Sequence, residues 1–401
     1  MRCSIERVEA RTQTSDMANI SKFMMYIKFL NMRHNTIALS LLSAAAAVTA
    51  DQILYPNTTG AYRVGYTDLE LVDYLRNDIF APTPQPRDLM ATLFYPIEDN
   101  QTMCTTKTLL TPLLAAYIDE LLATPSGTFS QFALPSCADA PIAHPEFPLV
   151  LFSHGYKGSR LLYAGFLQEF ASHGFNVLAV DHPYDATVVE YPDGRYVYNT
   201  LNDSVPGAVE QALNVRVQDV MFALSAMDNK TITSNIPGLS PKNLQTTRVG
   251  ITGHSFGGST TFQATANDTR FVAGTSFDGP FWGPANQTGT DAPIMLLSAL
   301  EPSSEDWMTE WIATWPRLRS TKGWFEVAGT LHLSFDDFPI LTDLLGVQVN
   351  DFVGNVTGER MVEIQSAFAT SFFNQFLKNQ TDGLFEDDDA ANWPEVSFVM
   401  D

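Results

Sequence analysis

The sequence predicts an α/β fold in which a mostly parallel sheet carries helices on both faces. The first observation is an alternation of short apolar runs with longer helix-compatible segments, from about residue 147 to residue 378. Parallel strands need such crossover helices, which then cover both faces of the sheet. The second observation is the motif Gly-His-Ser-Phe-Gly at residues 253–257, between an apolar run and a helix-compatible segment. A chain of 401 residues with 45% hydrophobic side chains can supply the large core of one such domain.

The period of the apolar residues predicts where the elements lie. An early strand or hairpin is predicted at residues 89–95. Short apolar runs bounded by turn residues indicate buried strands, which fall at 149–153, 175–181, 248–252, 271–277, 293–299 and 323–328. Segments with a helical period follow these strands, at 159–172, 207–228, 256–267, 305–313 and 359–378. Segment 183–206, rich in Tyr, Asp, Gly and Pro, is predicted to be a long loop over the carboxyl edge of the sheet.

Residues 253–257 have the context of a nucleophile elbow, because a strand precedes them and a helix follows. The central serine of such an elbow has a strained backbone with positive φ. Its neighbours two positions away must be very small to avoid the strand and the helix, and glycine at 253 and 257 meets this demand. Ser255 is therefore the predicted nucleophile of an α/β-hydrolase fold.

The general base is predicted by chain order. Folds built around this elbow place the residues in the order Ser, acid, His. Of the seven histidines, only His332 follows Ser255, and it comes just after the strand-like run 324–327. We therefore expect His332 to take the serine proton.

Two acidic residues compete for the third catalytic position. Asp278 follows the predicted strand 271–277, and Glu301 follows the predicted strand 293–299. An acid at either strand end could hold the imidazole in the tautomer that accepts the serine proton. The residues alone leave both candidates open.

The oxyanion hole is predicted to use two backbone amides. One belongs to Phe256, directly after the nucleophile, and the other to a loop after an earlier strand. That loop follows the apolar run 148–152, where Gly155 allows close approach of the substrate and the amide of Tyr156 can point inward. His154 is predicted to be structural. For His182 and Asp185, at the start of the long loop, a structural role and a place near the pocket stay open.

Several segments resemble the secreted platelet-activating factor acetylhydrolases, the 1-alkyl-2-acetylglycerophosphocholine esterases, and especially their fungal members. The resemblance extends over roughly residues 85–380, and its specific segments are Phe152–Gly155, Leu167–Val180, Gly253–Gly258, Phe277-Asp278 and Gly329–His332 with Phe335 and Asp337-Phe338. It implies a serine esterase with Ser255 as nucleophile, Asp278 as acid and His332 as base. It also implies amide donors at Tyr156 and Phe256, and it favours Asp278 over Glu301.

Two departures from the family pattern concern the substrate pocket. Tyr156 stands where a smaller aliphatic residue is familiar, and residues 279–282 differ from the segment expected after the acid. The leaving-group preference is therefore open. A general carboxylester or polyester hydrolase, similar to lipases and cutinases, is the alternative function. A non-catalytic relative of the fold is disfavoured by the intact Ser, Asp and His.

Residues 1–50 are predicted to be an N-terminal extension and secretion signal. An apolar run, 36–48, follows basic residues and ends in a small-residue cleavage pattern. Counted from Met32 the signal has a normal length, so the true start is predicted at Met32 with cleavage after Ala50. Residues 51–401 are then one secreted α/β-hydrolase domain with an acidic C-terminal tail.

Glycosylation and a disulfide are predicted for the same compartment. Asn-x-Ser/Thr acceptors after residue 50 number eight, at Asn57, Asn100, Asn202, Asn229, Asn267, Asn286, Asn355 and Asn379. Cys104 and Cys137 bracket a predicted helical insertion, 104–137. One disulfide between them is expected in an oxidising compartment, with two free thiols as the alternative.

Charge and motifs exclude several partners. The chain has 45 Asp and Glu against 23 Lys and Arg, a formal net charge of −22, which repels nucleic acid and anionic lipid. No His/Cys cluster has metal-ligand spacing and no glycine loop has phosphate-binding form, so no metal or cofactor is expected, and no obligate protein partner is evident. The expected partner is an ester or phospholipid substrate. Segment 109–122 is apolar nearly all round and is either a core helix or one that contacts a lipid interface, as a comparable helix does in the resembled family.

Overall fold

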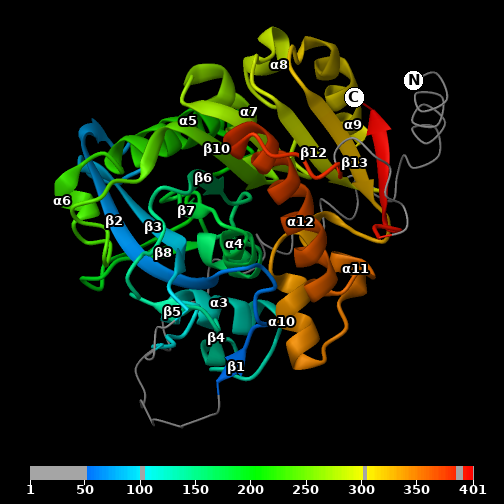
Figure 1. Ribbon diagram of the computed structural model, residues 1–401. Coiled ribbons are helices and arrows are strands. Elements are labelled where there is room, and N and C mark those ends of the chain that lie inside the picture. The colour runs from blue at the N-terminus through cyan, green and yellow to red at the C-terminus, as the bar shows by residue number, and fades with distance from the viewer. Residues whose placement is uncertain (1–51, 100–103, 301–304, 385–391, 401) are drawn as a thin grey trace.

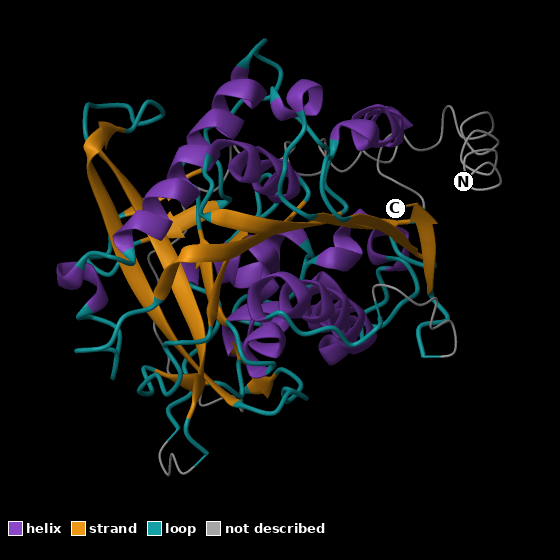
Figure 2. Ribbon diagram, turned by 45° about the horizontal axis from the view of Figure 1, so that its top comes forward, coloured by secondary structure: helices purple, strands orange, loops and turns teal. Residues whose placement is uncertain are grey.

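The computed structural model describes residues 52–99, 104–300, 305–384 and 392–400. Within these residues ten strands form one sheet, in the order β14-β13-β12-β11-β10-β6-β7-β3-β2-β5. Figure 2 shows the central part of this sheet with helices above and below it. The predicted α/β architecture is confirmed. The predicted signal segment and residues 385–391 of the acidic tail lie outside the described residues.

Six adjacent strands of the sheet are parallel. They are β7 (Asn176–Val180), β6 (Pro148–Ser153), β10 (Gln245–His254), β11 (Phe271–Phe277), β12 (Ile294–Ala299) and β13 (Lys322–Val327). Nearly every side chain of β6, β7, β11 and β12 is buried. This is expected of parallel strands that helices cover on both faces. The apolar runs predict all six strands, with ends that agree within about three residues.

Helices cover the two faces in separate groups. On one face α4 (Ala164–Ser172) packs against α12 (Gly358–Phe373), and their aromatic side chains enter the largest hydrophobic cluster. The other face carries α5 (Ala208–Ala226), α7 (Phe256–Asn267) and α9 (Glu305–Thr314). Alternate residues of β12 and β13 point to the two groups, as the pleat requires. Among the helices that the structure describes, none is long and apolar enough to span a membrane.

The order of the strands creates a crevice at the carboxyl end of β6. The chain passes from β6 to β7 on one side and later returns to β10 on the other side of β6. At such a switch in direction the loops after the two central strands diverge, and ligands bind in the space between them. The loops that follow β6 and β10 therefore meet at one site.

Antiparallel strands extend both edges of the sheet. β2 (Arg63–Asn77) and β3 (Pro86–Ile97) form a long hairpin beside β7, and β14 (Val396–Met400) pairs with β13 at the opposite edge (Figure 1). The sequence predicts only the 89–95 part of the hairpin. Charged residues interrupt the apolar run of β2, although Leu69 and Leu71 keep the two-residue period with both side chains buried. β14 comes after the acidic run and lies within the segment predicted as a tail.

Short elements complete the described chain. Strand β1 (Ile53–Leu54) pairs with β4 (Phe132–Ala133), and β5 (Cys137–Ala138) pairs with β2. The long loop contains a small hairpin of β8 (Val188–Glu190) and β9 (Tyr196–Tyr198). The short helices are α6 (Lys230–Thr233), α8 (Ala285–Thr288), α10 (Phe338–Leu345) and α11 (Asn350–Val353), with 3₁₀ turns at Phe129–Gln131, Arg160–Tyr163, Trp315–Arg317 and His332–Phe335 and a π turn at Asn374–Lys378.

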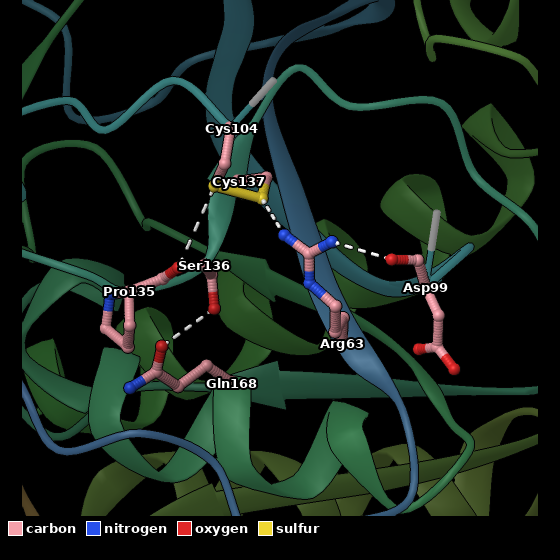
Figure 3. Close-up of a disulfide and its surroundings, with 7 residues drawn as sticks. All are labelled: Arg63, Asp99, Cys104, Pro135, Ser136, Cys137 and Gln168. Carbon is pink, nitrogen blue, oxygen red and sulfur yellow. Dashed lines mark hydrogen bonds between the residues drawn. A yellow bond between two sulfur atoms is a disulfide. The ribbon is translucent and has the colours of Figure 1, made fainter. Parts of the chain in front are cut away.

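The helical insertion is tied to the edge of the sheet by a disulfide. Cys104 and Cys137 are bonded, as predicted, and Cys137 begins β5 next to Gly65 of β2 (Figure 3). Its helix, α3 (Pro112–Leu121), is shorter than the predicted segment 109–122. Pro112 sets the first turn of the helix. The residues before it are not helical: Thr111 is extended, and the amide of Leu109 donates to the carbonyl of Phe132.

The disulfide closes a loop with a sequence separation of 33 residues. Replacing both cysteines by serine should lower the free energy of unfolding by about 3–4 kcal/mol, because the unfolded chain regains the entropy of the open loop. Urea denaturation of wild type and double variant measures this difference. Equal midpoints, with wild type also insensitive to dithiothreitol, would contradict the stabilising role.

Candidate active site

Ser255 occupies the tight turn between β10 and α7. Its backbone angles are φ 56° and ψ −122°, the strained conformation that the elbow motif predicts. A Cβ on Gly257 would lie 1.9 Å from the carbonyl oxygen of Ser153, and one on Gly253 would lie 2.3 Å from the carbonyl oxygen of Gly257. No side chain fits at either position, so both glycines are required by space. The strand, turn and helix place the serine hydroxyl at the carboxyl end of the sheet.

Ser255, His332 and Asp278 form one hydrogen-bonded chain. Nδ1 of His332 lies 2.6 Å from Oδ2 of Asp278, and Nε2 lies 2.9 Å from Oγ of Ser255. Because a carboxylate only accepts, Nδ1–H donates to Asp278 and Nε2 is left to accept the serine proton. The structure thus brings the three predicted residues together in the geometry of a nucleophile, its base and an orienting acid.

Asp278 is held by its own surroundings. It is fully buried, has a positive φ of 43° and follows β11, the strand next to the elbow strand. Its second oxygen accepts a hydrogen bond from the amide of Ala299 at 3.0 Å. This fixes the carboxylate plane while Oδ2 faces the histidine. The rival acid, Glu301, lies outside the described residues.

The loop after β6 lies against the nucleophile. A Cβ on Gly155 would be 3.3 Å from Cβ of Ser255, a tight contact, so glycine lets this backbone approach the serine without crowding it. The next peptide carries the amide of Tyr156, one of the two predicted oxyanion donors. The other, the amide of Phe256, belongs to the first residue of α7, where an amide has no acceptor within its own helix. The two amides therefore come from the segments that follow β6 and β10, on either side of the crevice.

A second hydrogen-bonded chain links these parts, and sequence reasoning missed it. The amide of Gly155 donates to the hydroxyl of Tyr163 at 3.0 Å, and that hydroxyl lies 2.8 Å from Nδ1 of His254. Nε2 of His254 lies 3.0 Å from the carbonyl oxygen of His332 and must donate to it, so Nδ1 accepts the tyrosine proton. Burial, with His332 nearby, holds the pKa of His254 well below its usual value. The neutral ring therefore connects the oxyanion loop, the elbow and the base.

The only sequence signal for this chain was the position of His254. Its place beside Ser255 suggests a specific partner, but the partner, Tyr163, lies 91 residues away. A contact between residues so far apart in the sequence can be identified only from the folded structure.

The buried residues His154, His182 and Asp185 make structural contacts. Nδ1 of His154 donates to the carbonyl of Gly155 at 2.7 Å, and its Nε2 accepts from the amide of His182. His154 is therefore structural, as expected, and burial keeps its pKa well below the usual value. His182 accepts from the hydroxyl of Ser153 and donates to Asp219, while Asp185 pairs with Arg216. None of these groups is among the residues that line the cavity at Ser255.

The serine opens into a cavity of about 270 Å³ with mainly apolar walls. Trp307 lies edge-on to the ring of His332, with 5.2 Å between ring centroids. Helix α3 forms another wall, and α10 and α11 a third; the larger side chains are Tyr117, Leu121, Leu122, Trp282, Phe338 and Phe352. A short acyl group and an alkyl-bearing leaving group both fit such a lining. Within the ranges that the structure describes, no three His, Cys, Asp or Glu side chains are grouped as metal ligands.

Comparison with known proteins agrees with this geometry. A model of the family described as "Platelet-activating factor acetylhydrolase, isoform II" matches residues 47–200 and 207–392. A probable 1-alkyl-2-acetylglycerophosphocholine esterase of Arthroderma benhamiae is 28% identical over 91% of this chain and 98% of its own. A platelet-activating factor acetylhydrolase of Cavia porcellus is 27% identical over 85% of this chain and 83% of its own.

A solved structure of a ferulic acid esterase from Streptomyces cinnamoneus superposes with a TM-score of 0.75. It is 27% identical and covers 88% of this chain and 100% of its own. The family match spans most of the chain, including the elbow, the acid and the base. The chain therefore belongs to the platelet-activating factor acetylhydrolase isoform II family of serine esterases.

Proposed function

We propose that the protein hydrolyses the short sn-2 acyl ester of a phospholipid through an acyl-enzyme on Ser255. The observation that carries this proposal is the hydrogen-bonded chain from Asp278 through His332 to Ser255, at the mouth of an apolar cavity. Family membership supplies the substrate class, since relatives are named for platelet-activating factor and for 1-alkyl-2-acetylglycerophosphocholine.

The proposed reaction has two halves. Oγ of Ser255 attacks the ester carbonyl while Nε2 of His332 takes its proton, and the amides of Tyr156 and Phe256 stabilise the oxyanion. His332 then protonates the leaving alcohol, which departs and leaves the acyl-enzyme. In the second half His332 takes a proton from water, whose oxygen attacks the acyl group, and returns that proton to Ser255. Asp278 keeps the imidazole in one tautomer and stabilises its positive charge throughout.

A general carboxylester hydrolase is the second candidate. It is favoured by the aromatic lining, in which Trp307 contacts the base and Trp282 contacts Phe256, and by the likeness to an enzyme titled ferulic acid esterase. Rates on 2-acetyl phospholipid, p-nitrophenyl acetate and a polyester film separate the two proposals. Preference for the phospholipid supports the first, and preference for either of the others supports the second.

We also propose secretion and N-glycosylation. The disulfide supports an oxidising compartment. Six of the acceptor asparagines are exposed, as a glycan requires: Asn57, Asn202, Asn229, Asn267, Asn355 and Asn379. Asn286 is half-buried and its Nδ2 donates to Glu310, so it is less accessible than the other six, while Asn100 lies outside the described residues.

Ser255→Ala removes the only atom that the proposed mechanism acylates. The variant should lose covalent labelling by an organophosphonate and hydrolysis of p-nitrophenyl acetate, while its thermal unfolding midpoint stays close to wild type. Mass spectrometry of the labelled protein measures the first effect. Labelling that persists in the variant would assign the nucleophile elsewhere.

Asp278→Asn should lower kcat by about 10⁴-fold, because an amide at this position favours the wrong imidazole tautomer. Glu301→Gln is the matched comparison, with an expected loss below about tenfold, since the hydrogen bond of Asp278 to His332 stays in place. Steady-state kinetics on p-nitrophenyl acetate measure both. The reverse ranking would assign the acid to Glu301.

Helix α3 is the proposed contact with a lipid interface. Leu114, Ala115 and Ile118 are buried against the core, whereas Leu121 and Leu122 are half-buried and line the cavity. The buried face therefore anchors α3 to the core, and the C-terminal end of α3 lines the cavity that contains Ser255. Contact with lipid would use apolar area alone, because the acidic protein offers no attraction to anionic headgroups.

Leu121→Ser with Leu122→Ser should weaken binding to phosphatidylcholine liposomes by about tenfold or more, through the loss of buried apolar area. Hydrolysis of soluble p-nitrophenyl acetate should be retained. Leu75→Ser is the control, since Leu75 is 98% exposed. It lies near the far end of β2, about 30 Å along the strand from the disulfide that holds the insertion containing α3. Unaltered liposome sedimentation, or unfolding of the double variant, would make α3 a core helix only.

A further inference from the structure

Arg216 of α5 is a fully buried arginine directly behind the oxyanion loop. Its Nη1 donates to the carbonyl oxygen of His154, and its Nη2 donates to that of Gly155 at 3.2 Å. The guanidinium also lies over the ring of Phe256, with 4.6 Å from Cζ to the ring centroid. One side chain therefore contacts both segments that carry the predicted oxyanion donors, the loop after β6 and the start of α7.

The contact with Gly155 fixes the direction of the neighbouring amide. In a trans peptide the carbonyl of Gly155 and the N–H of Tyr156 point in opposite directions. The carbonyl also accepts from the amide of Gly158 at 3.0 Å and from Nδ1 of His154 at 2.7 Å. With three donors on the carbonyl side of this peptide, its N–H points to the opposite side. The peptide lies close to the nucleophile, since a Cβ on Gly155 would be 3.3 Å from Cβ of Ser255.

Arg216 is itself fixed in position by a carboxylate. Asp185, buried at the start of the long loop, accepts from Nε at 2.7 Å and from Nη2 at 2.6 Å. This two-point contact sets the plane of the guanidinium, which a lysine ammonium could not reproduce. A cationic donor on the Gly155 carbonyl also polarises the peptide, so that the Tyr156 N–H becomes a stronger donor.

We infer that Arg216 is a positioning residue for the oxyanion hole, which it aligns from behind through the Gly155–Tyr156 peptide and the Phe256 ring. It touches neither substrate nor the reacting atoms, and Asp185 is its anchor. This role rests on the proposed function, because it matters only if an oxyanion forms at Ser255. Stabilisation of that oxyanion exists in the transition state and not in the bound substrate, so kcat and not KM should report it.

The test compares Arg216→Lys with Arg87→Lys. Arg87 is an equally buried arginine whose hydrogen bonds go to Asp78, Asp219 and the carbonyl of Pro183. The concentration of active sites is measured from the burst of leaving group that an organophosphonate releases when it labels the serine. Unfolded protein then does not lower the value of kcat. Arg216→Lys should lower kcat for p-nitrophenyl acetate by about 10²-fold, the usual effect of losing one oxyanion donor, with KM within about threefold.

A transition-state analogue gives the readout that a purely structural role would not change. A trifluoromethyl ketone adds to the serine as a tetrahedral oxyanion, so its affinity should fall by the same factor as kcat/KM. Arg87→Lys should change neither value by more than about threefold. An unaltered kcat per titrated site in Arg216→Lys, an unaltered inhibitor affinity, or an equal loss in Arg87→Lys would each overturn the inference.

Asp185→Asn keeps the test decisive if Arg216→Lys does not fold. It leaves the arginine in place but weakens its anchor, and it should lower kcat and inhibitor affinity together by about tenfold, since a charged acceptor is replaced by a neutral one. No loss would overturn the inference. A wild-type enzyme without any burst would contradict the proposed function itself, whereas a normal wild-type burst with unaffected variants contradicts the Arg216 role alone.

Discussion

The close approach of α7 to the end of β6 is the constraint on which the site depends. A Cβ on Gly257 would sit 1.9 Å from the carbonyl oxygen of Ser153, so helix and strand pack backbone against backbone. This contact forces the chain between β10 and α7 into a single tight turn, and the turn forces Ser255 into its strained conformation. The same contact brings the loop after β6 within reach of the serine. The packing of α7 against the end of β6 thus positions both the nucleophile and the oxyanion loop.

Sheet topology then supplies the remaining groups. Asp278 and His332 follow β11 and β13, which lie one and three strands from β10. Side chains at the carboxyl ends of parallel strands share one edge, so residues far apart in the chain meet without any special connection. The orientation of the imidazole still has to be set locally, and Ala299 does this by fixing the carboxylate that faces it. Topology gives proximity, and local hydrogen bonds give the reactive geometry.

Sequence patterns predicted the parts that depend on local rules. Apolar runs gave the six parallel strands, and the glycines at 253 and 257 gave the elbow, because both reflect steric demands within a few residues. The order of residues identified His332, but it could not choose between Asp278 and Glu301, since both follow strands of the same kind. β2 was missed because charged residues interrupt its apolar run, and their partners lie on other elements: Asp68 pairs with Arg160, Glu70 with Arg195 and Arg76 with Asp219. The contact of Tyr163 with His254 depends on the finished fold and has no local signal.

The buried charges near the site are difficult to explain by stability alone. Arg216 with Asp185, and Arg87 with Asp78 and Asp219, form ion pairs with almost no exposure. Removing two charges from water costs several kcal/mol per ion, and apolar residues of similar volume often stabilise a core as well or better. Apolar contacts have no preferred direction, so an apolar side chain in place of Arg216 could not orient the carbonyls of His154 and Gly155. The direction of a backbone amide is set by its own peptide plane, which a hydrogen bond to the carbonyl of the same peptide can fix. A rigid, multiply bonded guanidinium is suited to that task, and this gives the arginine a reason to be buried there.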